Sequence, residues 1–328
     1  MSALRGLKLT TVTLALGALA LAAPASAAPG DHTAVLPTIH VMGILNGANG
    51  SGHGKGGGGS STSNMYYHGG TSDGGTVPVG VETAPKVYLV FWGSQWNHND
   101  PSGEAGILTN FFNSVGGSSW NSTVTQYCQG ISSGASSCGS GSIPAGNQSG
   151  VYGGLWYDNA AAAPSRPTQS QLAAEAVAAA AKFGNTSASS NASVQYVIAT
   201  ATGNSSSGFG IRYCAWHSST TSVYGDVAYT NLPYITDAGT SCGANFVNSG
   251  TTGLTDGITI VGGHEFAETE TDQFPSTGWT DGSGAEIGDK CAWNSLTNNV
   301  QLNGNSFPVQ PLWSNAANGG TGGCVLTP

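Results

Sequence analysis

The sequence predicts an α+β protein with a mixed β-sheet, and three observations lead to this class. Two near-continuous apolar runs rich in β-branched and aromatic residues, 86–92 and 194–200, predict buried strands. Between these two strands, the alanine-rich stretch from Gln169 to Phe183 predicts a helix, because Pro167 precedes it and Gly184 follows it. Further along, a second helix is expected to carry the candidate active-site residues. Six cysteines predict disulfide-stapled loops around this framework.

Shorter signals predict the remaining elements. Residues 104–115 place apolar side chains at helical spacing, and 226–229 is a short strand candidate. The C-terminal region is rich in Gly and Asn and contains the segments 300–302 and 309–313. The sequence contains no internal repeat, so a single domain of roughly 250 residues is expected to follow a leader.

The N-terminus has the pattern of a secretion signal. Basic residues precede an apolar stretch that starts at Leu9, and Ala25-Ser26-Ala27 provides a small-residue cleavage site. We expect residues 1–27 to be removed and the product to be secreted to the extracellular space without a membrane span. Residues 28–76 are rich in Gly and Ser and are expected to form a flexible leader or propeptide. Residues 77–328 are expected to form the catalytic-type domain.

The charge of the chain excludes two classes of partner. After loss of the signal, six Lys and Arg (eight less Arg5 and Lys8) remain against 17 Asp and Glu, a net charge near −11. Binding to nucleic acid or to an anionic membrane surface is therefore not expected. Seven of the 17 acidic residues fall between Glu265 and Asp289, which gathers carboxylates as a cation site requires.

The six cysteines fit an oxidising compartment. Proximity along the chain favours three local bridges, Cys128–Cys138, Cys214–Cys242 and Cys291–Cys324, among the 15 possible pairings. No Cys-x-x-Cys pair occurs, so structural disulfides are expected rather than a cysteine-rich zinc site.

The segment from His264 to Glu268 is the most informative chemical pattern of the chain. It follows an apolar run and a Gly262-Gly263 pair, and it is a variant of the metallopeptidase signature His-Glu-x-x-His with a carboxylate at the last position. On a helix, positions four apart lie on one face, so His264 and Glu268 can hold one metal ion. Glu265 is then placed as general base toward a metal-activated water, which predicts metal-assisted hydrolysis.

A catalytic zinc site needs a third protein ligand. We expect Glu286 in this role, with Asp289 accepting the ring N–H of His264 and Asp272 as a competing ligand. If the segment from Glu286 to Asp289 is helical, these two carboxylates lie on the same face of the helix. Zn²⁺ is the expected cation, and the oxygen-rich ligand set leaves Ca²⁺ and Mn²⁺ open. His217, beside a predicted disulfide, is a candidate oxyanion donor, with a packed core histidine as the alternative.

The helix motif resembles that of the zincin metallopeptidases. His264 matches the first histidine of their motif and Glu265 the general base, while Glu268 stands where they have a second histidine. The resemblance implies a single zincin-like domain that holds zinc and hydrolyses peptide bonds. Glu286 lies at the distance where the glutamate-type zincins place their third ligand.

A longer resemblance is to the phosphate-induced, EXORDIUM-like extracellular proteins. They show a similar His-Glu-x-x-Glu followed by Thr-Asp, a Trp and Glu-Ile-x-Asp-x-Cys, here Thr271-Asp272, Trp279 and 286–291. Further similar blocks are 88–92, 212–216, 233–242 and 303–324, so the resemblance covers most of residues 85–324. It implies an extracellular, cell-wall-associated protein linked to growth signalling.

Two functions from different classes follow. The first is a secreted, monomeric, metal-dependent endopeptidase whose protein or peptide substrate lies along an edge strand near the helix. The second is a non-catalytic extracellular, cell-wall-associated binding protein in which the carboxylates hold a structural cation. A hydrolase acting on a wall polymer is a third possibility, suggested by export and aromatic content alone.

Overall fold

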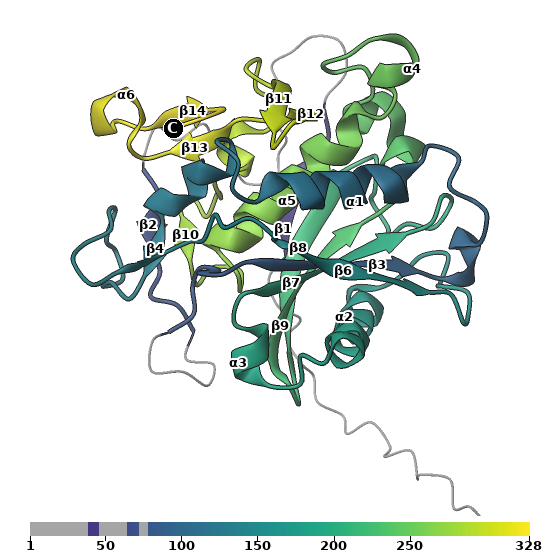
Figure 1. Ribbon diagram of the computed structural model, residues 1–328, viewed down its shortest axis with the longest axis horizontal. Helices are drawn as coiled ribbons and strands as arrows, with labels where there is room; N and C mark the ends of the chain where they lie inside the picture. The colour runs from purple at the N-terminus through teal and green to yellow at the C-terminus, as the bar shows by residue number, and fades with distance from the viewer. Residues whose placement is uncertain (1–38, 46–63, 72–77) are drawn as a thin grey trace, which may run out of the picture. The chain divides into compact units, whose positions relative to one another are not determined.

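A computed structural model describes residues 39–45, 64–71 and 78–328 (Figure 1). The expected signal peptide and most of the expected leader lie outside these ranges. The described chain is α+β with a mixed sheet, as predicted. Within the described ranges, no helix combines the length and the apolar character that a membrane crossing requires.

Six strands form the central sheet in the order β1-β8-β9-β7-β3-β6. Strands β6, β3, β7 and β9 pair in parallel, whereas β8 pairs antiparallel with β9 and β1 pairs antiparallel with β8. The bounds of these strands are β1 His40–Gly43, β3 Lys86–Trp92, β6 Tyr152–Asp158, β7 Val194–Thr200, β8 Tyr213–Ser222 and β9 Gly225–Leu232.

The other elements surround this sheet. The longer helices are α1 Glu104–Val115, α2 Gln169–Phe183 and α5 Asp256–Thr271. Short helices are η1 Ser94–Trp96, η2 Asn121–Gln126, α3 Ala188–Asn191, η3 Ile235–Cys242, α4 Gly250–Gly253, η4 Asp289–Cys291 and α6 Ala317–Gly320. Short strands are β2 Tyr66–Tyr67, β4 Cys128–Gln129, β5 Ile143–Pro144, β10 Trp279–Thr280, β11 Asn298–Leu302, β12 Asn305–Val309, β13 Leu312–Ser314 and β14 Gly323–Val325.

Alternate side chains of the central strands enter two hydrophobic cores, one on each face of the sheet. In β3, Val87, Leu89 and Phe91 belong to the core that also contains residues of α1 and α5. Val90 belongs to the other core, together with residues of α2. Figure 1 accordingly shows α1 and α5 on one side of the sheet and α2 on the other.

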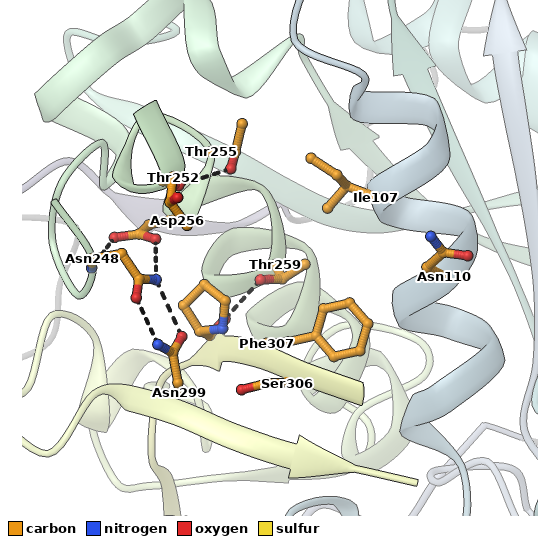
Figure 2. A pocket seen from close by; sticks show the side chains of 11 residues that line it. Ile107, Asn110, Asn248, Thr252, Thr255, Asp256, Thr259, Asn299, Ser306 and Phe307 are labelled. Carbon is orange, nitrogen blue, oxygen red and sulfur yellow. Dashed lines mark hydrogen bonds between the residues drawn. The ribbon is translucent and has the colours of Figure 1, made fainter. Parts of the chain in front are cut away.

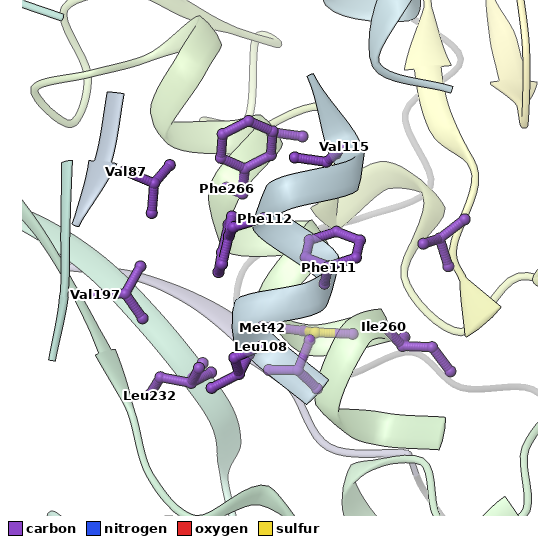
Figure 3. Packing of buried hydrophobic residues seen from close by; sticks show 14 of the residues in the cluster. Met42, Val87, Leu108, Phe111, Phe112, Val115, Val197, Leu232, Ile260 and Phe266 are labelled. Atoms are coloured by element: carbon purple, nitrogen blue, oxygen red, sulfur yellow. The ribbon is translucent and has the colours of Figure 1, made fainter. Parts of the chain in front are cut away.

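The helices α1 and α5 approach each other closely at the glycine pair of α5. A Cβ atom at Gly263 would lie 3.2 Å from Phe111 Cζ, and one at Gly262 would lie 3.4 Å from Leu108 Cδ2. Figure 3 shows the side chains of α1 packed between α5 and the strands. The two glycines therefore bring α5 against α1, which buries the face of α5 that leads into the predicted metal motif.

The elements predicted most firmly from the sequence are confirmed. The structure has α1, α2, β3 and β7 with the predicted bounds, and residues 226–229 lie within β9. In the C-terminal region, β12 ends at Val309 and β13 starts at Leu312. Pro311 lies between them and has no N–H for a strand ladder.

All three predicted disulfides are confirmed. Cys128–Cys138 closes the loop between β4 and β5. Cys214–Cys242 joins β8 to η3, and Cys291–Cys324 joins η4 to β14. The last two bridges hold elements that carry candidate site residues.

Two segments of the expected leader are part of the fold. Strand β1 is the outermost strand of the sheet beside β8, and its Met42 is fully buried. Strand β2 pairs antiparallel with β10, and Tyr67 is buried there. The folded domain thus includes residues before the predicted start at 77. Strands of two to four residues are too short for hydrophobic periodicity to predict.

Glu104, at the first turn of α1, makes the stability of the fold dependent on pH. Burial raises its pKa to about 8, although the N–H of Ile235 donates to both of its oxygens. Between pH 4.5 and about 8, the folded state therefore keeps a proton that the unfolded state has lost. Stability then falls with rising pH, by at most about 1.4 kcal/mol per pH unit from this group.

We therefore expect Glu104→Gln to reduce the loss of stability between about pH 5 and about pH 8. The measurement is the free energy of unfolding in urea at both pH values, for the wild type and the variant. Other buried carboxyl groups contribute equally to both proteins, so the difference isolates Glu104. An identical pH dependence in the two proteins would show that Glu104 does not titrate as described.

Candidate metal centre

Helix α5 is buried along its whole length, and its charged residues are buried with it. His264 and Glu268 are 0% exposed and Glu265 is 1% exposed. A charge removed from water in this way is costly unless it is paired or bound to a cation. The contacts of these side chains therefore determine what the helix can do.

The predicted pair on one face of α5 is present. His264 Nε2 lies 3.0 Å from Glu268 Oε2, and Asp289 Oδ1 lies 3.8 Å from the same nitrogen. The three side chains offer ligand atoms that all lie within 4.8 Å of one another. We call His264, Glu268 and Asp289 the α5 ligand set.

A second group of possible ligands lies beside the first. Glu286 Oε2 is 2.9 Å from Nε2 of His217 and 2.7 Å from Nδ1 of His40. His217 is on β8 and His40 on β1, and the antiparallel register places the two residues opposite each other. We call His40, His217 and Glu286 the strand ligand set.

Glu265 joins the two sets. An oxygen of its carboxylate lies within 4.8 Å of ligand atoms of both His217 and Glu268, and His217 Nε2 is 3.8 Å from Glu268 Oε2. Both oxygens of Glu265 are buried without a hydrogen-bond partner, and so are Glu268 Oε2 and Glu286 Oε1. Unpartnered buried carboxylate oxygens are the atoms that a divalent cation would bind, so the residues present fit a metal.

Gln310 holds the ring of His264. Its Oε1 lies 3.1 Å from His264 Nδ1, and its Nε2 donates to the carbonyl of Gly288 at 2.8 Å. With Nδ1–H donating to Gln310, Nε2 is left as the ligand atom. The sequence had predicted Asp289 as the acceptor of this N–H. In the structure, Asp289 instead belongs to the α5 set, and its backbone N–H donates to Glu268 Oε1.

The turn from Glu286 to Asp289 passes directly over the ring of His264. A Cβ at Gly288 would lie 2.8 Å from His264 Nδ1 and 2.8 Å from Glu268 Oε1, so only glycine fits. The segment is a turn that enters η4 rather than a helix over both acidic residues. Glu286 and Asp289 consequently go to different ligand sets instead of sharing a face.

Asp272 is placed differently from the other predicted ligands. Its carboxylate accepts hydrogen bonds from the backbone N–H groups of Ser276, Thr277 and Gly278, at 2.6, 2.9 and 2.5 Å. Burial raises its pKa to about 7. Asp272 therefore holds the loop that follows α5, and it belongs to neither ligand set.

The histidines carry the balancing charge when no cation is bound. Burial alone lowers their pKa values, but the neighbouring carboxylates raise these values by a larger amount. The pKa of His264, beside Glu268, rises to about 10, and that of His217, beside Glu286, rises to about 9. His40, also beside Glu286, is raised to about 10. A cation that binds here must therefore displace protons from imidazole.

Sequence reasoning missed His40 and assigned His217 a different role. His40 is in the expected leader, between Ile39 and Val41, and the Gly- and Ser-rich composition of that leader predicted no strand there. His217 was a candidate oxyanion donor, and the structure places its Nε2 against Glu286. Gln310 was also missed, because a single neutral amide side chain gave no metal-ligand pattern to interpret.

A pocket of about 360 Å³ lies apart from these ligands, beside the first turn of α5 (Figure 2). It is lined by residues of α1, α5 and the β11–β12 hairpin. Asp256 is the acidic residue in its wall, and its carboxylate accepts from Asn248 and from the backbone N–H of Val247. No histidine lines the pocket, so it offers none of the catalytic groups described above.

No protein-family model, no curated protein and no solved structure matches this chain.

The contact between Gln310 and His264 can be tested through metal affinity. We expect Gln310→Leu to weaken zinc binding by about 10- to 100-fold, because the ring of His264 loses the group that fixes its orientation and tautomer. Gln301→Leu, an exposed position on β11, is the matched control and is expected to bind zinc as the wild type does. Competition with a chromophoric chelator measures both. Equal zinc affinities in the two variants would show that Gln310 does not support the metal centre.

Proposed function

We propose that this protein is a secreted metal-dependent endopeptidase of the zincin type. In this proposal His264, Glu268 and Asp289 hold the catalytic cation, and Glu265 is the general base. The observation that carries it is the carboxylate of Glu265, which is buried beside the α5 set with both oxygens unpartnered. Such a group is costly in a protein interior, and perturbed buried carboxylates of this kind concentrate at functional sites.

The α5 set combines one imidazole with two carboxylates. With neutral histidine, its charge balances that of a divalent cation, and Zn²⁺ is the proposed ion with Ca²⁺ and Mn²⁺ as alternatives. When bound, the cation would polarise the carbonyl of the scissile peptide bond and make a water molecule more acidic. Because two carboxylates reduce the residual charge at the site, Glu265 has to contribute more to removing the proton.

Glu265 is suited to accept that proton. Burial raises its pKa to about 8, although His264 acts in the opposite direction. A nearby divalent cation lowers the pKa of a carboxyl group, which moves Glu265 toward the range in which a general base works at neutral pH. The same carboxyl group can return the proton to the leaving amine.

The exposure of the ligands indicates where a substrate approaches. The side chain of Asp289 is 19% exposed, whereas that of His264 is 0% exposed. A peptide bond therefore reaches the α5 set from the side of Asp289 and η4. The oxyanion-donor role of His217 stays a prediction, since its Nε2 contacts Glu286.

The alternative function is a non-catalytic extracellular binding protein with a structural cation. One observation favours it, namely the nearly complete burial of the ligands, which is typical of closed structural sites. In that case Glu265 is only one more carboxylate near the ion. Its replacement by an uncharged isostere would then leave binding and fold unchanged.

Glu265→Gln separates the two functions. We expect the variant to keep its bound zinc and to lose peptide hydrolysis by at least about 100-fold, because the general base is absent. Glu175→Gln, on α2 at the opposite face of the sheet, is the matched control and is expected to retain activity. Cleavage of a peptide library followed by mass spectrometry measures activity, and elemental analysis measures zinc. Full activity in Glu265→Gln, or no cleavage by the wild type under any metal condition, would contradict the proposal.

A further inference from the structure

We propose that His40, His217 and Glu286 form a second divalent-cation site, distinct from the α5 set, and that a zinc ion there fastens strand β1 to the sheet. This site goes beyond the proposed catalytic function, which requires a single cation. It uses a histidine from the segment that the sequence placed in a flexible leader.

The geometry brings the three side chains to one point. His40 Nδ1 and His217 Nε2 both contact the same oxygen of Glu286, at 2.7 and 2.9 Å. Atoms bound to one zinc ion at about 2.0 to 2.2 Å each lie no more than about 4 Å apart, so these spacings suit a shared ion. Glu286 is 0% exposed and its other oxygen has no hydrogen-bond partner. The carboxylate is thus only partly satisfied by the two imidazoles.

The two ligand sets are separate. They share no residue, and the three groups of mutually close ligand atoms among the described residues never combine His264 with His217. His217 Nε2 of one set lies 3.8 Å from Glu268 Oε2 of the other. One ion therefore cannot bind all the ligands without a rearrangement of the buried centre.

Two divalent cations can balance the charge of the cluster. It contains three imidazoles and four carboxylates, from Glu265, Glu268, Glu286 and Asp289. With neutral imidazoles, two divalent cations cancel the four negative charges, whereas one cation at the α5 set requires protonated His40 and His217 to supply the other two positive charges. The carboxylate of Glu265 lies near ligands of both sets, where it reduces the repulsion between two ions. Asp272 is excluded from this count because backbone N–H groups hold its charge.

The ligand chemistry identifies the ion. Two imidazole nitrogens and one carboxylate are a ligand composition that zinc adopts in proteins, while the α5 set offers only one nitrogen. Zinc is therefore expected to bind the strand set at least as tightly as the α5 set.

A cation at this position would secure a short strand. β1 has only four residues. Beyond its pairing with β8, its contacts include Met42 in the core, His40 with Glu286, and the indole N–H of Trp293, which donates to the carbonyl of Gly43. A zinc ion bound to His40 joins β1 to β8 and to the turn at Glu286. Removal of the ion is expected to release the strand more readily than the rest of the sheet.

The test is to count zinc ions in four forms of the full chain after saturation and dialysis: the wild type, His40→Ala, His264→Ala and the control Ile39→Ala. Ile39 adjoins His40 and is 41% exposed, so its replacement leaves the ligands intact. We expect two zinc ions per chain in the wild type and the control, and one in each histidine variant. The ion that remains in His40→Ala also shows that this variant is folded.

Hydrogen exchange of the β1 amides gives a second readout that does not depend on activity. Exchange at Val41 and Met42 is expected to rise at least tenfold in His40→Ala relative to Ile39→Ala, and to remain slow in zinc-loaded His264→Ala. Equal exchange in His40→Ala and the control would overturn the fastening of β1.

The pattern of zinc loss distinguishes this site from the catalytic one. One ion in the wild type that persists in His40→Ala and disappears in His264→Ala would overturn the second site and leave the proposed function intact. One ion that persists in His264→Ala and disappears in His40→Ala would support the strand site and would contradict a zinc ion at the α5 set. One ion lost in both variants indicates a single shared ion and overturns the second site. A wild type without zinc overturns the zinc site at β1 and leaves Ca²⁺ or Mn²⁺ as the catalytic ion of the proposed function.

Discussion

The burial of charge along α5 is the constraint on which the rest of the structure depends. A helix enclosed on all sides is normally apolar, yet α5 places a histidine and several carboxylates in the interior. Hydrophobic packing cannot compensate such groups, so the neighbouring segments have to bring opposite charge or a cation to them. Strands β1 and β8 bring imidazoles, and the turn before η4 brings two more carboxylates.

Several features without chemical roles follow from this requirement. The glycine pair of α5 brings the helix against α1, and Gly288 lets the turn pass over the ring of His264. Gln310 then links that ring, through its Nδ1, to the carbonyl of Gly288. The Cys291–Cys324 bridge follows directly after the turn and ties it to β14, so the position of the ligands is fixed by covalent as well as by packing forces. These contacts fix the orientation of the ligands before an ion binds. A metal site needs such pre-organisation to bind one kind of ion in preference to others.

The sequence predicted what is local and left out what depends on distant contacts. Helical spacing placed His264 and Glu268 on one face, and the order of cysteines was sufficient for the three bridges. The roles of Glu286 and Asp289 could not be predicted, because they depend on whether a short segment forms a helix or a turn. His40 was beyond prediction, since its partners lie on β8 and after α5 and its own strand has four residues. Pairing between such distant segments is decided by the folded sheet, not by local preference.

The ligands also constrain the order in which the protein can be completed. His40 stands near the beginning of the chain and Glu286 near its end, whereas β3, β7 and β9 can pair before the last segments are in place. Contacts between residues so far apart form late, because the loop between them has to be closed first. Neither His40 nor His264 has its full set of partners until the turn after α5 has docked. Bound metal would therefore mark only chains whose folding is complete.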